Sequence, residues 1–358
     1  MGLFDLSIRL RKVFGVVGLI IVTLIVLWFL WLAARVIYNY ITTQEQTNPG
    51  AFFGTISPPN LPKSNVDLTG SSFQIDLPEG FLPQSPAELP VYPIPKPAGT
   101  LNSPEDSKNK VRSVGFTETP TRLSEAVYSW KDPINDAKSI TMNIASGEFT
   151  YRYNLKKDPE IIEGKFIIDE VEAVRKGQQF LHRLGSFPED LNDGPTVINF
   201  YRQKGTKRKR ATSFSEANQV EVYYFRKSIN NQYPIVQSNP DLSYIRVLLG
   251  SNLLKERGVV EADYVYWPIK YDDSSLYPIK TADQAWSEFQ EGKAVFVKGV
   301  QKSYQEVFLE NVELAYFETK SYQPYAQPIY IFRGSGVSNN KLVEFVAYLP
   351  AVSNDLLK

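Results

Sequence analysis

The residues with the most evident chemical potential are carboxylates that lie close together in the chain. They are Glu189 with Asp190 and Asp193, Glu261 with Asp263, and Asp272 with Asp273. Glycoside hydrolysis needs two carboxyl groups on facing elements in unequal environments, and a sequence does not fix that geometry. A glycan-binding module or hydrolase of the cell envelope, using carboxylates and aromatic side chains, is therefore our alternative hypothesis.

Other catalytic groups are scarce. The chain has no cysteine and one histidine, His182, which excludes thiol nucleophiles, disulfides and cysteine or multi-histidine zinc sites within one chain. No Gly-x-Ser-x-Gly elbow or comparable motif presents a nucleophile that His182 could activate as a general base. We therefore interpret His182 as a solvated or helix-capping residue. The Asp190-x-x-Asp193-Gly194 motif lacks the spacing and final glutamate of a calcium loop. We predict no enzymatic activity, no cofactor and no metal site.

One strong run of charge is basic, from Lys204 to Arg210. It falls between a strand that ends near Tyr201 and another that begins near Gln219, which favours a solvated hairpin tip. The functional interpretation is a contact with an anionic polymer, lipid headgroups or an acidic partner. The candidate residues for that contact are Lys207, Arg208, Lys209 and Arg210. Because basic and acidic residues both number 39, we predict no nucleic-acid partner.

Aromatic residues are unusually frequent, with 21 tyrosines, 21 phenylalanines and 5 tryptophans. They cluster at 264–267 and 322–325. Packing between strands is the common explanation for such clusters, and an aromatic groove for a peptide, glycan or partner strand is the other. The sequence leaves both open.

These groups must be positioned by the elements that follow an apolar N-terminal run. The run from Val13 to Ala34 carries no charge, and about 20 such residues at about 1.5 Å rise cross a hydrocarbon core of roughly 30 Å. We predict a transmembrane helix over 13–34. A cleaved signal peptide is the competing interpretation, but the run exceeds the usual length of its apolar part.

Basic residues predict the orientation of this helix. Three precede the run, namely Arg9, Arg11 and Lys12, and only Arg35 follows it closely. The positive-inside bias then makes residues 1–12 a short cytoplasmic segment and places the bulk of the chain outside the plasma membrane. Trp28 and Trp31 lie toward the outer end and are predicted to anchor the helix at the lipid interface.

Residues 35–100 are rich in proline and predict a stiff stalk. Within it, residues 72–77 alternate as a strand does, and residues 89–92 are expected to pair at a sheet edge. We therefore expect the stalk to be partly ordered.

Beyond the stalk, a capped helix followed by strands recurs over 101–160, 161–275 and 276–358. The helices are expected to open at Ser103, Asp169 and Thr281, each near a matching acid or amide, and to stop at glycines. The second helix is expected to turn four side chains inward, namely Val171, Val174, Leu181 and Leu184. The pattern predicts an α+β protein, with one N-terminal transmembrane helix followed by repeated modules of helix plus antiparallel sheet.

Strand segments are predicted from alternation of period two. Examples are residues 140–144 with 149–153, and residues 220–224 with 244–248. The last unit reads as a three-stranded meander over 312–317, 329–332 and 343–349, with Gly334-Ser335-Gly336 in its second turn.

The closing stretch carries a resemblance to a known family. Its residues are the Thr281-to-Trp286 helix start, Gly292, and the strands Val312-to-Tyr316 and Gln327-to-Phe332. They are similar to the extracytoplasmic, PepSY-like repeats of YycI/YycH-type regulators. The resemblance implies a membrane-anchored protein that regulates a membrane sensor kinase without catalysis. We expect a scaffold or regulator that binds another membrane or envelope protein through its membrane helix and exposed sheet edges.

Overall fold

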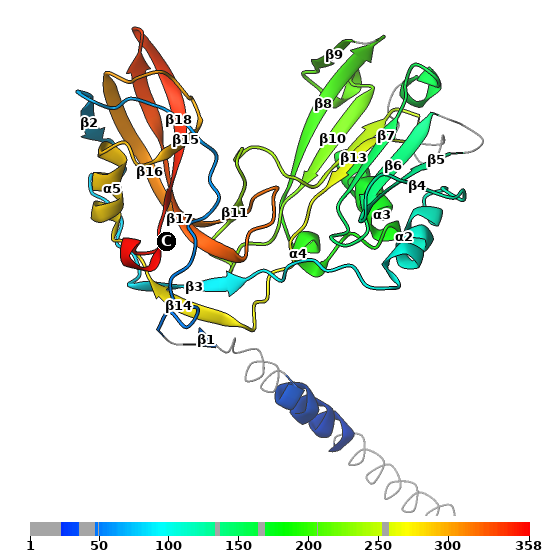
Figure 1. Ribbon diagram of the computed structural model, residues 1–358, viewed down its shortest axis with the longest axis horizontal. Helices are drawn as coiled ribbons and strands as arrows, with labels where there is room; N and C mark the ends of the chain where they lie inside the picture. Colours follow the sequence, from blue (N-terminus) through cyan, green and yellow to red (C-terminus); the bar gives the residue numbers. More distant parts are fainter. Residues whose placement is uncertain are drawn as a thin grey trace, which may run out of the picture.

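The computed structural model describes residues 23–35, 47–48, 50–132, 137–163, 169–205, 207–252 and 258–358. This part of the chain is mostly β, with two nine-stranded sheets. The predicted α+β class is wrong, because the alternating segments join into two long sheets while the helices between them stay short. Figure 1 shows the sheets in two lobes that diverge from a base formed by β3, β14 and α4.

The N-terminal helix is described over 23–35, which covers part of the predicted 13–34 span, and Trp28 and Trp31 are exposed on it. Among the described residues, no helix is long and apolar enough to cross a membrane. This finding overturns the predicted single-pass location in the plasma membrane. The predicted cytoplasmic segment 1–12, and residues 13–22, lie outside the described residues.

The first sheet, here the mid-chain sheet, is antiparallel throughout. Its strands, in spatial order, are β4 (Thr121–Arg122), β5 (Val127–Lys131), β6 (Lys138–Asn143), β7 (Phe149–Tyr153), β13 (Val259–Tyr264), β12 (Arg246–Gly250), β10 (Gln219–Tyr224), β8 (Thr196–Lys204) and β9 (Lys207–Arg210). Pairing of β7 with β13 joins strands of the first two predicted units into this one sheet.

Helices cover one face of the mid-chain sheet. They are α2 (Ser103–Arg112), α3 (Glu170–Arg183) and the short α4 (Glu189–Asn192). The predicted start of α3 is confirmed, because the Asp169 side chain accepts a hydrogen bond from the Glu172 amide. Val171, predicted inward, is 76% exposed. Leu181 and Leu184 are buried as predicted and Val174 packs against the core. Helical periodicity also buries Ala173, Gly177 and Phe180.

The second sheet, here the C-terminal sheet, draws strands from both ends of the chain. Its main path runs in the order β1 (Thr47–Asn48), β14 (Ser274–Pro278), β3 (Glu88–Pro93), β17 (Tyr325–Ser338), β16 (Glu306–Phe317) and β11 (Ile235–Val236). Three further strands join this path. β2 (Ser72–Ile75) pairs with β16, and β18 (Lys341–Pro350) pairs with both β17 and β15 (Val295–Lys298). The strands expected within the stalk are confirmed as β2 and β3. β3 lies between β14 and β17 and is not the edge strand we expected.

One helix, α5 (Ala282–Gln290), packs on the C-terminal sheet through Trp286 and Phe289. Its predicted capping box is confirmed, since Thr281 and Gln284 exchange hydrogen bonds between side chain and backbone. Short 3-10 turns are described at η1 (Pro159–Ile162), η2 (Phe214–Glu216) and η4 (Asn354–Leu356).

The predicted meander is confirmed as β16, β17 and β18, but its second turn lies elsewhere. Asn339 and Asn340, with φ of 50° and 60°, make the turn, as paired left-handed residues do in two-residue hairpins. Gly334 and Gly336 lie inside β17, where an added Cβ would collide with Phe308 and Tyr304. These glycines permit close packing across the strand and do not mark a turn.

Candidate functional site

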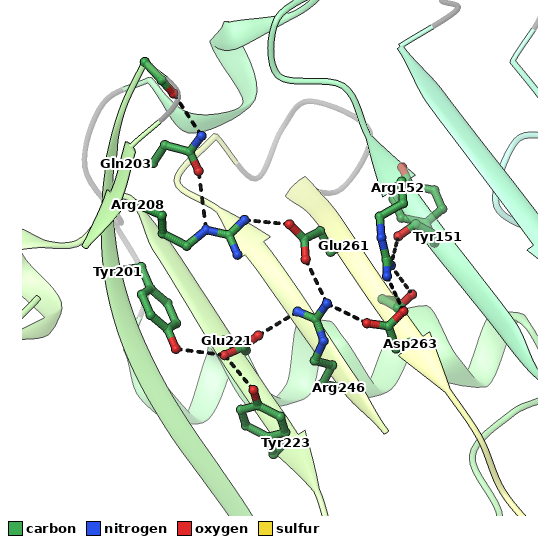
Figure 2. A network of polar contacts seen from close by, with 12 residues as sticks. Tyr151, Arg152, Tyr201, Gln203, Arg208, Glu221, Tyr223, Arg246, Glu261 and Asp263 are labelled. Atoms are coloured by element: carbon green, nitrogen blue, oxygen red, sulfur yellow. Dashed lines mark hydrogen bonds and ion pairs between the residues drawn. The ribbon is translucent and has the colours of Figure 1, made fainter. Parts of the chain in front are cut away.

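The face of the mid-chain sheet opposite the helices carries charged side chains. Strand alternation explains the division in β10, where Val220, Val222 and Tyr224 join the core beneath α3. Glu221 and Tyr223 therefore point to the other side. We call this side the network face, because its charged groups form one continuous set of contacts (Figure 2).

Arg246 on β12 lies at the centre of that set. Its guanidinium contacts three carboxylates on the two neighbouring strands, namely Glu221 at 2.6 Å, Glu261 at 2.9 Å and Asp263 at 2.5 Å. The side chain is 19% exposed. Burial opposes the charged form, but the three carboxylates outweigh it and raise the pKa of Arg246. Arg246 is thus a fixed cation at the centre of the sheet.

Two further arginines extend the set on either side. Arg208 on β9 contacts Glu261 at 2.6 Å, and Arg152 on β7 contacts Asp263 at 2.5 Å. Tyr201 and Tyr223 each donate a hydrogen bond to the second oxygen of Glu221, at 3.1 and 2.9 Å. These eight residues are the arginine network: Arg152, Arg208, Arg246, Glu221, Glu261, Asp263, Tyr201 and Tyr223.

The arginine network balances three cations against three carboxylates. Burial raises the pKa of Glu261, but hydrogen bonds from Arg208 and Arg246 prevail and hold that pKa below its usual value. Burial and the nearby Glu221 carboxylate raise the pKa of Tyr201 and Tyr223. The carboxylate remains ionised and the phenols remain hydrogen-bond donors near neutral pH. This arrangement suits a fixed polar surface better than proton transfer, which uses a pKa near the working pH.

A cavity of about 380 Å³ opens beside the network. The sheet contributes part of its wall, the 238–244 loop between β11 and β12 contributes another part, and Lys320 comes from the segment after β16. The lining residues used below are Phe149, Tyr223, Leu242, Tyr244, Arg152 and Lys320. Apolar and aromatic walls with a few polar groups are typical of a binding site. We call it the junction cavity, since residues linked to both sheets line it.

A second charged cluster, here the joint, holds the two sheets together. Arg226 follows β10, and its side chain is only 2% exposed. It contacts Asp190 of α4 at 2.7 Å and Glu318, which follows β16, at 3.0 Å. The Tyr266 ring lies 4.5 Å from the guanidinium, within range of a cation–π interaction.

Hydrogen bonds complete the joint. Arg226 donates to the Trp267 carbonyl at 2.9 Å, and the Trp267 indole donates to the Thr319 carbonyl at 2.9 Å. Gln237 donates to Glu318 at 3.0 Å. Burial raises the pKa of Glu318 in spite of Arg226, while the surrounding acceptors raise the pKa of Arg226 against the effect of burial. The joint therefore has a structural role between the lobes.

The four basic residues proposed from sequence lie on β9, an edge strand, where alternation divides them. Arg208 pairs with Gln203 in the ladder and Arg210 with Tyr201, so both share the network face. Arg210 donates to Asn199 at 2.9 Å. Lys207 and Lys209 point to the opposite side. The tip predicted between strands near Tyr201 and Gln219 is not what forms, because β8 continues to Lys204 and Lys207–Arg210 pair with it as β9. The anionic contact stays a prediction.

The other sequence candidates separate widely. Glu261 and Asp263 belong to the network and Asp190 to the joint. His182 is exposed and its ring packs on Phe187. Tyr264 and Trp267 are buried in cores. In the described ranges, no group of three or more histidines, cysteines or carboxylates could hold a metal ion.

Sequence reasoning missed both central arginines. Arg246 falls inside the strand segment predicted at 244–248, where no role is assigned to it, and Arg226 lies outside every predicted segment. A usable signal was a charged residue within an otherwise apolar strand, as in Arg246 before Val247, Leu248 and Leu249. Such a position favours a paired charge on one face.

Comparison with known proteins leaves the family open. No family model matches the chain, and no characterised protein matches it in sequence. Among solved structures it is similar to an uncharacterized protein from Eubacterium rectale ATCC 33656, with a TM-score of 0.43 and 9% identity over 79% of this chain and 88% of that one. The likeness to YycI/YycH-type regulators stays a prediction.

Proposed function

We propose that this chain is a non-enzymatic scaffold or regulatory protein that binds an acidic segment of another protein on its network face. The observation that carries the proposal is the charge balance of the arginine network. Its three carboxylates are all paired with arginines, so the network is internally neutral and rigid. Arginine and tyrosine on such a surface favour protein contacts.

The network itself is neutral, and two cations that flank it give the network face its positive charge. Among the described residues, Arg210 and Lys320 have no carboxylate partner. Arg210 lies on β9 beside Tyr201, and Lys320 lines the junction cavity. With strands spaced by about 4.8 Å, the four steps from β9 to β13 cover roughly 19 Å. An extended acidic segment can span that distance and place an apolar side chain in the junction cavity.

A photo-crosslinking amino acid at Leu242 tests this proposal in the cells that make the protein. Leu242 is 38% exposed in the junction cavity, and Leu342, 68% exposed near the start of β18 in the C-terminal sheet, is the matched control position. We expect protein adducts from Leu242, cross-linked to a segment rich in Asp and Glu. Adducts should fall when Arg210→Glu and Lys320→Glu are combined. Equal adducts from both positions would contradict the proposal.

A glycan is the second candidate ligand, favoured by one observation. Tyr223 and Tyr244 line the junction cavity together with Asn239 and Asp263, and aromatic side chains beside polar groups suit a sugar ring. The same experiment separates the two, since adducts from Leu242 that carry only carbohydrate would favour the glycan. The charge reversals should then have little effect on adduct yield.

A further inference from the structure

One edge of the C-terminal sheet is incompletely paired. β16 is covered at its start by β2, which pairs with residues Glu306 to Leu309, and at its end by β11, which pairs with Tyr316 and Phe317. Residues 310–315 lie between these two stretches. We call them the edge gap. At about 3.3 Å per residue it extends over roughly 20 Å.

The main-chain groups of the edge gap that face outward belong to Val312 and Leu314. Tyr316 donates its amide toward β11, to the Pro234 carbonyl. Because strand amides alternate sides, Leu314 and Val312 turn their N–H and C=O groups the same way. In the part of the chain that the structure describes, no strand pairs with them on that side. They form a short free edge on β16, whose opposite side pairs with β17.

A cavity of about 250 Å³ lies over the edge gap. Its lining includes Val312 and Leu314, the prolines Pro83, Pro86 and Pro234, and Tyr233. Proline has no N–H, so the three prolines cannot supply main-chain donors that compete with those of β16. Gln84, Ser85 and Gln232 also line the cavity, so its wall is mixed, and the strand edge supplies one set of its main-chain hydrogen-bonding groups.

We infer that the edge gap binds an extended peptide segment of a partner protein, which pairs with Val312 and Leu314 as an added strand. Continuity with the sheet supports this occupant, because β2 and β11 already pair with the same edge on either side. An extended main chain offers the complementary donors and acceptors, as in other cases of strand addition. A segment of about four residues fits the interval between the flanking strands. This inference does not rest on the proposed function.

N-methylated peptides test strand addition on the unaltered full chain. The probe is acetyl-Thr-Val-Thr-Val-Thr-amide, compared with one version methylated on the valine amides and another methylated on the threonine amides. Along a strand, every second residue turns its amide toward a given neighbouring strand, so pairing uses either the valine amides or the threonine amides. We expect one methylated version to lose affinity about tenfold, from loss of about two hydrogen bonds, and the other to bind nearly as well as the parent.

Hydrogen exchange locates the peptide. Exchange of the 310–315 segment should slow when the parent peptide is added, and exchange of the arginine network should not change. Gln84→Trp with Gln232→Trp, both at exposed positions that line the cavity, should block binding. Lys341→Trp at the exposed start of β18 is the matched control. No slowing at millimolar peptide, or equal loss with both methylated versions, would overturn the inference. Either result leaves the acidic-segment proposal intact, because Arg210 and Lys320 are not part of this test.

Discussion

Two arginine clusters in this molecule have similar components and different surroundings. The network around Arg246 lies within one sheet, pairs three cations with three carboxylates, and keeps its central side chain 19% exposed. The joint around Arg226 connects two sheets, sets one arginine against Asp190 and Glu318, and leaves that arginine only 2% exposed. Burial decides their roles. The joint holds the lobes together, while the network offers a fixed surface to a partner.

Arg226→Met should give the largest effect. Removing one partner of a buried ion pair leaves the other charges uncompensated, which costs about 3–5 kcal/mol. Glu318 and Asp190 would both lose their cation. We expect the free energy of unfolding in urea to fall by that amount, along with weaker coupling between the lobes. A loss below about 1 kcal/mol would show that the joint does not stabilise the fold.

Arg246→Met should be less damaging because water reaches the network. Hydrogen bonds to charged groups contribute about 1.5–3 kcal/mol. Arg208 and Arg152 would still neutralise Glu261 and Asp263, and Glu221 would keep the hydrogen bonds from Tyr201 and Tyr223. We therefore expect a loss of about 2 kcal/mol in the same urea experiment. If Arg246→Met proves as costly as Arg226→Met, exposure is not what distinguishes the clusters.

The dependence of stability on pH should differ in sign between the clusters. The pKa of Glu261 is lowered in the folded state. Its contribution to the free energy of unfolding is therefore present above the unfolded-state pKa of about 4.3 and is lost as the pH falls through the folded-state pKa. The pKa of Glu318 is raised by burial, so its contribution is present below about 4.3 and is lost as pH rises through the folded value.

Glutamine variants measure this difference. Relative to Glu261→Gln, the wild type should lose stability as the pH falls below about 4. Relative to Glu318→Gln, it should lose stability as the pH rises above about 4, by at most about 1.4 kcal/mol per pH unit for one proton. The comparison needs urea unfolding from pH 3 to pH 8. Parallel curves for the two variants would contradict the assigned directions.

Local signals in the sequence predicted local structure correctly. The caps at Asp169 and Thr281 depend on neighbours three residues away, and the structure confirms both. The turn at Asn339 and Asn340 was missed because Gly334 and Gly336 gave a stronger turn signal than the asparagine pair. In a strand, glycine also permits close approach, and the sequence does not separate these uses.

Pairing between distant segments was beyond prediction. Arg246 meets Glu221 and Glu261 only because β10, β12 and β13 become neighbours. Arg226 meets Glu318 across 92 positions in the chain. The fold class failed for the same reason, since the alternating segments were identified individually while the joining of β7 to β13 into one long sheet depends on tertiary contacts. Strand alternation then decides which of the charged residues share a face.

Lys320→Ala should leave stability nearly unchanged and alter binding. The side chain is exposed and, among the described residues, has no carboxylate partner, so the free energy of unfolding should change by less than about 0.5 kcal/mol. Binding of a hexaglutamate peptide, measured by calorimetry, should weaken severalfold, and its dependence on salt should decrease, because one screened attraction is removed. Lys341→Ala, at an exposed lysine remote from the network face, should bind as the wild type does. A neutral hexaglutamine peptide should not distinguish the three proteins. Equal weakening by Lys320→Ala and Lys341→Ala would assign the attraction to overall charge and remove the special role of the network face.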